Sequence, residues 1–240
     1  MKSEKIRLNK YLAECGICSR READKYIEQG RVTVNGSRAV TGTQVAKQDR
    51  ICVDGKKLHG KNKKVVLAYY KPIGVTCTEK DRFAEKTIHD VIHYPVRVTY
   101  AGRLDKDSEG LLLLTNDGLL IQKMMKAANC HEKEYVVKVK KELTEEFLKR
   151  MSEGVFLKEL EQTTRPCKIV KEGKYTFRIV LTQGLNRQIR RMCEALGQEV
   201  RSLKRIRVLN IELDDLKCGQ YREIKGEQLA RLYEQAGWSR

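Results

Sequence analysis

The stretch GRLDKDSEGLLLLTNDG, residues 102–118, places an acidic loop directly before a run of four leucines. Asp105 lies between Arg103 and Lys106, and Asp107 follows two residues later. An ionised carboxylate held there can act as a nucleophile or as a base, and nearby cations lower the pKa of a carboxylate. The alternative is a solvated turn in which Asp105 hydrogen-bonds only its own loop, as aspartate commonly does. Spacing alone leaves both interpretations open.

The loop is expected to connect two strands, so that its side chains project from the end of a rigid sheet. The strand before it is VRVTYAG, and the strand after it is the leucine run. Strands outnumber helices in this part of the chain and arrive in hairpins, which predicts an α+β domain with a mixed, largely antiparallel sheet. The other expected elements are a strand ending at Lys71-Pro72, a short helix at 86–93, a helix at 119–128, a strand at 133–139, a helix after Thr144 closed by Gly154, a hairpin around Glu172-Gly173, a helix capped by Asn186 and closed by Gly197, and a final helix at 226–236.

The first sixty residues form a separate pattern. Residues 7–15 have the periodicity of a short amphipathic helix with a basic side. Ser19 and Glu22 have the spacing of a capping box at the start of a second helix, and Gly30 fits the position after its last turn. Short strands with a tight turn at Asn35-Gly36 follow. We therefore expect a small α/β domain at 1–60, a charged linker at 61–64 and a second domain at 65–240.

Composition limits the partners. Lys and Arg total 49 against 32 Asp and Glu, a formal charge of +17, which favours a polyanionic partner such as nucleic acid over an anionic membrane. No apolar run approaches the roughly 18 to 20 residues that span a bilayer, and residues 1–20 lack the apolar core of a signal peptide. The eight cysteines are then expected to be reduced thiols of a cytoplasmic protein.

Two patterns of cysteine and histidine have spacings that occur in metal sites. Cys15 and Cys18 form a CxxC, but no second CxxC follows at zinc spacing. His89 and His93 have the spacing of a zinc-binding helix face, but the glutamate of HExxH is missing. No Walker loop or GxGxxG is present either. We expect no metal and no cofactor.

The first sixty residues resemble the S4 RNA-binding domain through LNKYLAECGICSRREADKYIEQGRVTVNG. The resemblance implies a basic face that contacts folded RNA, mainly at phosphates, which give affinity with little sequence information. The alternative for each residue is an ordinary solvated charge. The implied contacts are Arg7, Lys10, Ser19, Arg20, Arg21 and Lys25, with Arg31 and Asn35 as further candidates.

The rest of the chain resembles the pseudouridine synthases, in the branch with an N-terminal S4 domain that modifies ribosomal RNA. The resemblance rests on residues 102–118 together with YKPIGV at 70–75, KEY at 133–135 and GLNRQIRRM at 184–192, all in the family's order. ANCHEKEY and GLNRQIRRMCEALG are most similar to the enzymes of that branch that act on the large subunit, and hence on 23S rRNA. Ser108 stands where related sequences often have Thr, which keeps the hydroxyl.

The resemblance implies a role for five residues. Asp105 matches the catalytic aspartate, Tyr135 the aromatic residue that stacks on the target base, and Arg190 the basic residue that pairs with the aspartate. Ile189 matches the aliphatic residue beneath the base, and Arg103 the arginine that fills the gap left by the flipped nucleotide. The implied reaction isomerises uridine to pseudouridine and needs no cofactor. Whether the aspartate attacks ribose C1′ or removes the C2′ proton stays open.

Alternatives remain beside this reading. Taken singly, Tyr135 is better explained as an ordinary strand aromatic and Arg190 as a solvated helix residue. The main rival function is a non-catalytic S4-type RNA-binding factor in ribosome assembly, and a DNA-binding regulator is weaker because no recognition-helix unit is evident. The expected partner is ribosomal RNA or a pre-ribosomal particle, bound by a monomer.

Overall fold

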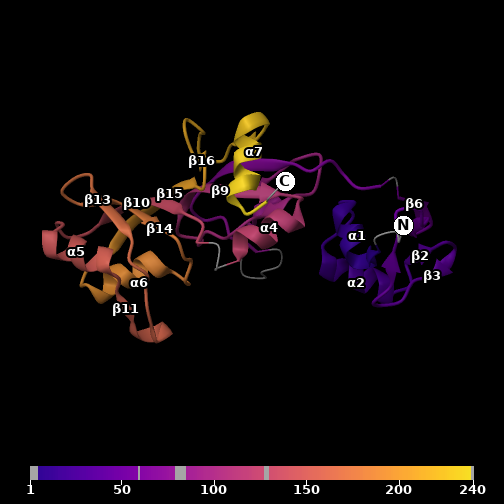
Figure 1. Ribbon diagram of the computed structural model, residues 1–240, viewed down its shortest axis with the longest axis horizontal. Helices are drawn as coiled ribbons and strands as arrows, with labels where there is room; N and C mark the ends of the chain where they lie inside the picture. Colours follow the sequence, from indigo (N-terminus) through magenta and orange to yellow (C-terminus); the bar gives the residue numbers. More distant parts are fainter. Residues whose placement is uncertain (1–4, 59, 79–84, 127–129, 239–240) are drawn as a thin grey trace. The chain divides into compact units, whose positions relative to one another are not determined.

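The computed structural model describes residues 5–58, 60–78, 85–126 and 130–238, and these form two compact units (Figure 1). Unit 1 contains the described residues up to Val65 together with Tyr94–Thr99 and Asn116–Gly118. Unit 2 contains Val66–His93, Tyr100–Thr115 and the described residues from Leu119 onward. The two short segments of unit 1 that come from beyond residue 65 were expected in the second domain, so the division is less linear than the sequence predicts.

Unit 1 packs two short helices against small sheets. The predicted capping box is present, because the Ser19 hydroxyl accepts from the backbone N–H of Glu22 and the Glu22 side chain accepts from that of Ser19. Asn35 and Gly36 both have positive φ, as a tight hairpin turn requires. The elements are β1 (Ile6–Arg7), α1 (Leu8–Glu14), α2 (Arg20–Glu28), β2 (Val32–Val34), β3 (Ser37–Arg38), β4 (Gln44–Val45), β5 (Ile51–Val53) and β6 (Lys56–Lys57), with the sheets β1-β4 and β3-β2-β5-β6.

The segment 61–64, expected to be a free linker, is attached to unit 1. The Asn62 side chain donates to the backbone oxygen of Cys15 (3.0 Å), just after α1. Lys64 forms an ion pair with Asp117, 2.8 Å between nitrogen and oxygen. These contacts explain why the segment and residues 116–118 cluster with the first helices.

Unit 2 is built on a nine-stranded mixed sheet. Its path runs β13-β14-β10-β15-β9-β7-β17, with β16 beside β15 and β8 beside β9. Strands β9 and β15 are parallel, and the other described pairs of this sheet with a stated register are antiparallel, as predicted. The strands are β7 (Val66–Lys71), β8 (Thr99–Tyr100), β9 (Glu109–Thr115), β10 (Lys133–Val139), β13 (Lys168–Lys171), β14 (Thr176–Leu181), β15 (Val200–Val208), β16 (Ile211–Glu212) and β17 (Tyr221–Glu223).

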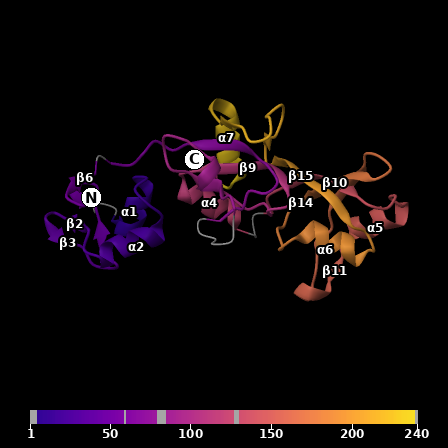
Figure 2. The same cartoon turned by 180° about the vertical axis from the view of Figure 1, so that it is seen from behind.

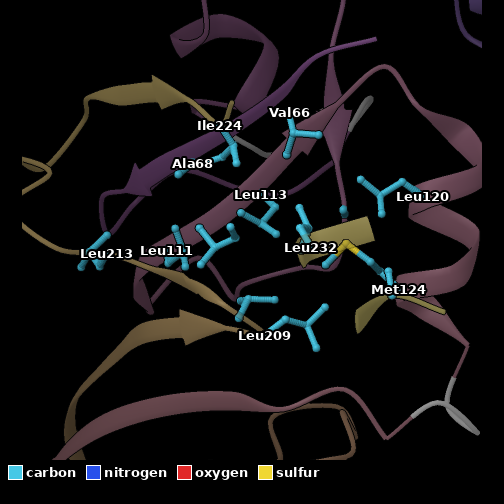
Figure 3. Close-up of a cluster of buried hydrophobic side chains, with 14 of the residues drawn as sticks. Val66, Ala68, Leu111, Leu113, Leu120, Met124, Leu209, Leu213, Ile224 and Leu232 are labelled. Atoms are coloured by element: carbon cyan, nitrogen blue, oxygen red, sulfur yellow. The ribbon is translucent and has the colours of Figure 1, made fainter. Parts of the chain in front are cut away.

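Helices cover both faces of this sheet. Helices α4 (Gly118–Met125) and α7 (Gly226–Gln235) pack on one apolar cluster, where Leu111 and Leu113 of β9 meet Leu120 and Leu232 (Figure 3). Helices α5 (Glu145–Glu153) and α6 (Gln188–Ala195) pack on a second cluster over β10 and β14. Figures 1 and 2 show α7 and α6 on opposite sides of the sheet. The small hairpin of β11 (Phe156–Leu157) and β12 (Gln162–Thr163), joined by a 3₁₀ turn, lies beside α6.

Several predicted elements are confirmed and others are shorter. Thr144 caps α5 by accepting from the N–H of Phe147, and Gly154 ends it, as expected. The helix expected at 86–93 is α3 (Ile88–Val91), and the strand VRVTYAG is reduced to β8. Part of the helix expected at 119–128 lies outside the described residues. Each described helix is too short or too polar to cross a lipid bilayer.

The predicted cap of α6 is wrong. The residue before the helix is Arg187, whose φ is 50°, in the left-handed region, and no side chain caps it. The carbonyl oxygen of Asn186 instead accepts from Arg191 (3.1 Å). Because the chain turns at Arg187, the helix begins at Gln188 rather than directly after Asn186.

Candidate active site at the end of strand β9

Backbone hydrogen bonds hold the acidic loop on both sides. The N–H of Gly74 donates to the oxygen of Lys106 (2.8 Å), and the N–H of Ser108 donates to the oxygen of Asp105 (3.1 Å). Ser108 is buried, and β9 begins at the next residue, Glu109. Since β9 lies inside the sheet between β7 and β15, the C-terminal end of the loop is attached to a rigid strand.

A cavity of about 440 Å³ opens beside this loop. Its volume is within the range of pockets that enclose small ligands, about 300–1,000 Å³. The lining combines the acidic loop with the start of β10, the end of β14, the start of α6, the middle of β15 and the end of α4. Segments that are far apart in the sequence therefore meet around one space.

Four of the five residues expected in the catalytic centre line this cavity. Asp105 is about one-third exposed (35% of its side chain), and Arg103, on the same loop, is exposed. Tyr135 is half-buried on β10, and Ile189 is buried on α6. The structure thus brings these side chains to one place, while their individual roles stay predictions.

Arg190 lies differently from the expectation that it pairs with Asp105. Its Nη2 donates to the backbone oxygen of Asp107 (2.9 Å), and its Nε lies 3.3 Å from the Asp107 carboxylate. The ion-pair partner of Asp105 is Arg187, with 3.8 Å between Nη1 and Oδ2. Arg187 also makes a two-pronged contact to Asp107, at 2.9 and 3.2 Å. Arg190 therefore holds the loop through Asp107, and Arg187 forms the ion pair with the Asp105 carboxylate.

The sequence gives no direct signal for Arg187. A non-glycine residue with positive φ is strained, and such residues gather at functional sites. The strain is visible only in the backbone angles. In the sequence, the motif NRQIRR contains four other polar or basic residues, and nothing distinguishes Arg187 from them. α6 then points Ile189 and Met192 into the apolar cluster, and this anchors the helix whose first turn faces the loop.

The arginines beside the loop change the pKa of the Asp107 carboxylate. Partial burial raises the pKa of Asp107, but the hydrogen bond from Arg187 and the charge of Arg190 lower it by a larger amount. The pKa of Asp107 is therefore below its ordinary value. The guanidinium of Arg187 is held by the same contact, and its pKa is raised. The loop therefore carries a fixed ion-pair network directly beside Asp105.

Three cations lie close to the loop, two of them buried and the third, Lys133, half-buried. Arg205 on β15 is 2% exposed and lines the cavity. Lys71 is fully buried, and burial lowers the pKa of its ammonium, while the charges of Cys77 and Asp105 act in the opposite direction. Lys133 also lines the cavity, and burial and the charge of Arg205 lower its pKa. The cavity is therefore suited to a ligand with negative charge or with many acceptor oxygens.

Within the described residues, no group of three or more His, Cys, Asp or Glu side chains has the arrangement to hold a metal ion. Cys15 and Cys18 are both buried in unit 1 as free thiols. Burial raises the pKa of Cys18 to about 11, which keeps this thiol protonated at neutral pH.

The RNA contacts expected in unit 1 fall into two groups. Arg7 precedes α1, and α2 presents Arg20, Arg21 and Lys25; all four are exposed. The hydroxyl of Ser19, by contrast, is buried in the capping box.

Three other candidates have protein partners. Lys10 lies 3.8 Å from Glu14. Arg31 pairs with Asp54, and the Asn35 side chain donates to Asp49 (3.0 Å). The exposed cations of α2 are the better-placed candidates for RNA contacts.

Comparison with known proteins decides what class of enzyme this site belongs to. Residues 65–195, more than half of the chain, match the model of the family described as RNA pseudouridylate synthase. The chain belongs to the RNA pseudouridylate synthase family. Residues 6–51 match the S4 domain, which confirms the resemblance of the first sixty residues. The protein is thus a pseudouridine synthase with an S4 domain, and a purely RNA-binding factor is disfavoured.

Relatives of this pseudouridine synthase match almost the whole chain. It is 47% identical over 230 residues to the dual-specificity RNA pseudouridine synthase RluF of Escherichia coli (strain K12), covering 95% of this chain and 78% of the relative. It is 39% identical to ribosomal large subunit pseudouridine synthase B of Bacillus subtilis (strain 168), covering 94% and 95%. A crystal structure of a pseudouridylate synthase has a TM-score of 0.69 and 29% identity, covering 95% of this chain and 99% of the other. The match in sequence and fold includes both units.

Proposed function

We propose that this enzyme isomerises a specific uridine of ribosomal RNA, in the large subunit, within the cavity beside Asp105. The observation that carries the proposal is the convergence of Asp105, Tyr135 and Arg187 on one space. The relative from Bacillus subtilis is named for the large ribosomal subunit, and a 34% identical relative from Pasteurella multocida (strain Pm70) for the small one. The higher identity to the large-subunit relative supports 23S rRNA.

The target uridine must leave the RNA stack before any side chain reaches its sugar, which costs a few kcal/mol. Tyr135 offsets part of that cost by stacking on the base, and Ile189 lies under the base. The exposed side chain of Arg103 fills the space that the nucleotide leaves. The cavity volume of about 440 Å³ accommodates one nucleotide rather than a duplex.

Asp105 starts the reaction as an ionised carboxylate. It either attacks ribose C1′ or removes the C2′ proton, and both routes release the base for reattachment through C5. Arg187 supplies a permanent positive charge 3.8 Å from the Asp105 carboxylate. Arg190 holds the loop through Asp107, so its part in catalysis is to keep Asp105 in place.

Affinity for RNA comes largely from the net charge of +17 and the exposed cations of α2. We propose that the working unit is a monomer. We place this reaction in the cytoplasm, where ribosomal RNA is accessible during assembly. Sedimentation with and without RNA tests the monomer.

Tritium release from RNA labelled at uridine C5 tests the function. The substrates are 23S and 16S transcripts and immature ribosomal particles, since the substrate is either free RNA or an assembly intermediate. We expect release from large-subunit RNA with the wild type and none with Asp105→Asn, while RNA binding is retained. Asp107→Asn is the matched control, because it changes a neighbouring carboxylate that contacts arginines; it should slow release without abolishing it. Turnover by Asp105→Asn would remove Asp105 from the chemistry.

A further inference from the structure

One row of residues crosses the sheet next to the acidic loop. Tyr135 of β10 pairs with Arg205 of β15, Arg205 pairs with Gly110 of β9, and Gly110 pairs with Lys71 of β7. Residues paired directly across neighbouring strands point to the same face of a sheet. Arg205 is therefore the immediate neighbour of the tyrosine proposed to stack on the base.

Two nitrogens of Arg205 hold the ends of the loop that carries Asp105. Its Nε donates to the backbone oxygen of Leu111 (2.7 Å), after the loop, and its Nη1 donates to the oxygen of Arg103 (3.3 Å), before Asp105. Gly110 makes this possible because it has no side chain between the two strands. The guanidinium is thereby fixed in one orientation.

The third nitrogen of Arg205, Nη2, is buried and has no hydrogen-bond partner among the described residues. Arg205 itself is only 2% exposed and contributes to the lining of the cavity. A buried charged donor without an acceptor is unfavourable, because it has lost its water without gaining a protein partner. A ligand that brings an acceptor oxygen into the cavity removes that penalty.

We propose that Arg205 is a catalytic residue, whose Nη2 donates a hydrogen bond to a carbonyl oxygen of the uracil while the base is detached from the ribose. The inference rests on the proposed function, because it assumes that the cavity receives the target uridine. It adds a role for a residue outside the four sequence motifs.

The chemistry requires such a donor. When the C1′–N1 bond breaks, its electron pair stays with the uracil, and the negative charge spreads over N1 and the two carbonyl oxygens. This holds whether C1′ forms a bond to the Asp105 carboxylate or the C2′–H pair forms a C1′=C2′ double bond as the proton moves to Asp105. A fixed donor at a carbonyl oxygen stabilises this anion until C5 bonds to C1′. As that bond forms, the bond between Asp105 and C1′ breaks, or C2′ takes its proton back from Asp105; C5 then loses its proton and N1 gains one.

An arginine suits this position better than the neighbouring lysines. Arginine keeps its charge when buried, whereas a buried lysine readily loses its proton. Lys71 and Lys133 both show that tendency, because burial lowers the pKa of each. The guanidinium also has enough donors to hold two carbonyls and still offer a third group to the base.

The test begins with the wild type, whose target uridine is located on the transcripts or particles described above; absence of any tritium release there counts against the proposed function itself. A short RNA containing that uridine then serves as the probe, with normal, 2-thio or 4-thiouridine at the target. Single-turnover rates at saturating RNA and RNA Kd are measured for wild type, Arg205→Met and Arg205→Lys. Arg201→Met is the matched control, since Arg201 is an exposed arginine on the same strand.

We expect Arg205→Met to lower the rate about 100-fold or more, as loss of one such donor does, with Kd within about twofold. Arg205→Lys should recover part of the rate, and Arg201→Met should stay within about twofold of the wild-type rate at saturating RNA. A sulfur accepts hydrogen bonds poorly, so one thio substitution should slow the wild type and have no further effect on the Arg205 variant.

Three results overturn the proposal: a folded Arg205→Met with a rate near that of the wild type, a thio effect of equal size in wild type and variant, or no thio effect in the wild type. If Arg205→Met does not fold, Arg205→Lys takes its place in the thio comparison, because it keeps an N–H donor and most of the side-chain volume.

Discussion

Gly110 is the position where a single added carbon should do the most damage. A Cβ built there would lie 2.2 Å from the backbone oxygen of Arg205 and 2.7 Å from its nitrogen, and the φ of Gly110 is 109°. The clashing atoms belong to the backbone of β15 and cannot move as a flexible side chain would. Gly110→Ala must therefore separate β9 from β15 or distort both.

The size of the effect can be built from two parts. A non-glycine residue held in such a backbone conformation costs about 1–3 kcal/mol. Inserting a methyl group into a packed region costs about 1–3 kcal/mol more. Together these give a loss of about 2–6 kcal/mol, against a total stability of about 5–15 kcal/mol for a domain.

Two glycines of the same unit separate these parts. Gly219 has a φ of 82° but open space around its Cβ position, so Gly219→Ala should cost only the conformational part, about 1–3 kcal/mol. Gly173 has open space and no positive φ, so Gly173→Ala should be close to neutral. Urea unfolding followed by the fluorescence of Trp238, the single tryptophan, gives the three free energies of unfolding. The steric reasoning fails if Gly110→Ala is no less stable than Gly219→Ala.

Three further predictions concern rate, pH and salt. Tyr135→Phe keeps the ring that stacks on the base and loses the hydroxyl, so a fall of less than about tenfold in the single-turnover rate is expected, and a larger fall would assign chemistry to the hydroxyl. Burial raises the pKa of Glu134, but the hydrogen bond from Arg207 (2.6 Å) helps to lower it overall. Because the pKa of Glu134 is lower in the folded state than in the unfolded state, its carboxylate stabilises the fold above the unfolded value, and this contribution is lost as pH falls through the folded value. Glu134→Gln should therefore be less stable than the wild type at pH 7 in urea titrations, and the difference should shrink as pH falls below about 4.3, the ordinary pKa of Glu. A difference that stays constant with pH would contradict this. Arg20→Gln with Arg21→Gln should weaken RNA binding and reduce the slope of log K against log salt by up to about 2 in filter-binding assays, and an unchanged slope would remove both from the phosphate contacts.

Local signals in the sequence predicted what local structure depends on. The capping box at Ser19, the cap at Thr144 and the turn at Asn35 each require only residues within a few positions of one another, and all three are present. The predicted cap at Asn186 is absent, because Arg187 adopts a left-handed conformation that the neighbouring residues in the sequence do not dictate. Segment 116–118 joins unit 1 through contacts to residues some fifty positions earlier, which no local pattern contains.

The site shows the same division between local and long-range information. Asp105, Tyr135 and Ile189 were found through motifs, and the structure brings them to one cavity. Arg205 and Lys71 were missed, because their positions depend on the pairing of β15 with β9 and of β9 with β7. Strand register between distant segments is set by packing of the whole sheet, so single residues on those strands give no sign of which face they share.

A register shift in the sheet separates the chemistry from the supporting ion pairs. Glu134 pairs with Arg207, but its neighbour Tyr135 pairs with Arg205, so Ile206 is an extra residue on β15. In a regular strand, Arg205 and Arg207 would share a face; the bulge turns them to opposite faces. Arg207 therefore bonds Glu134 on one side of the sheet, while Arg205 and Tyr135 line the cavity on the other. It follows that Glu134→Gln should alter stability with little change in rate, and that Tyr135→Phe should alter rate with little change in stability.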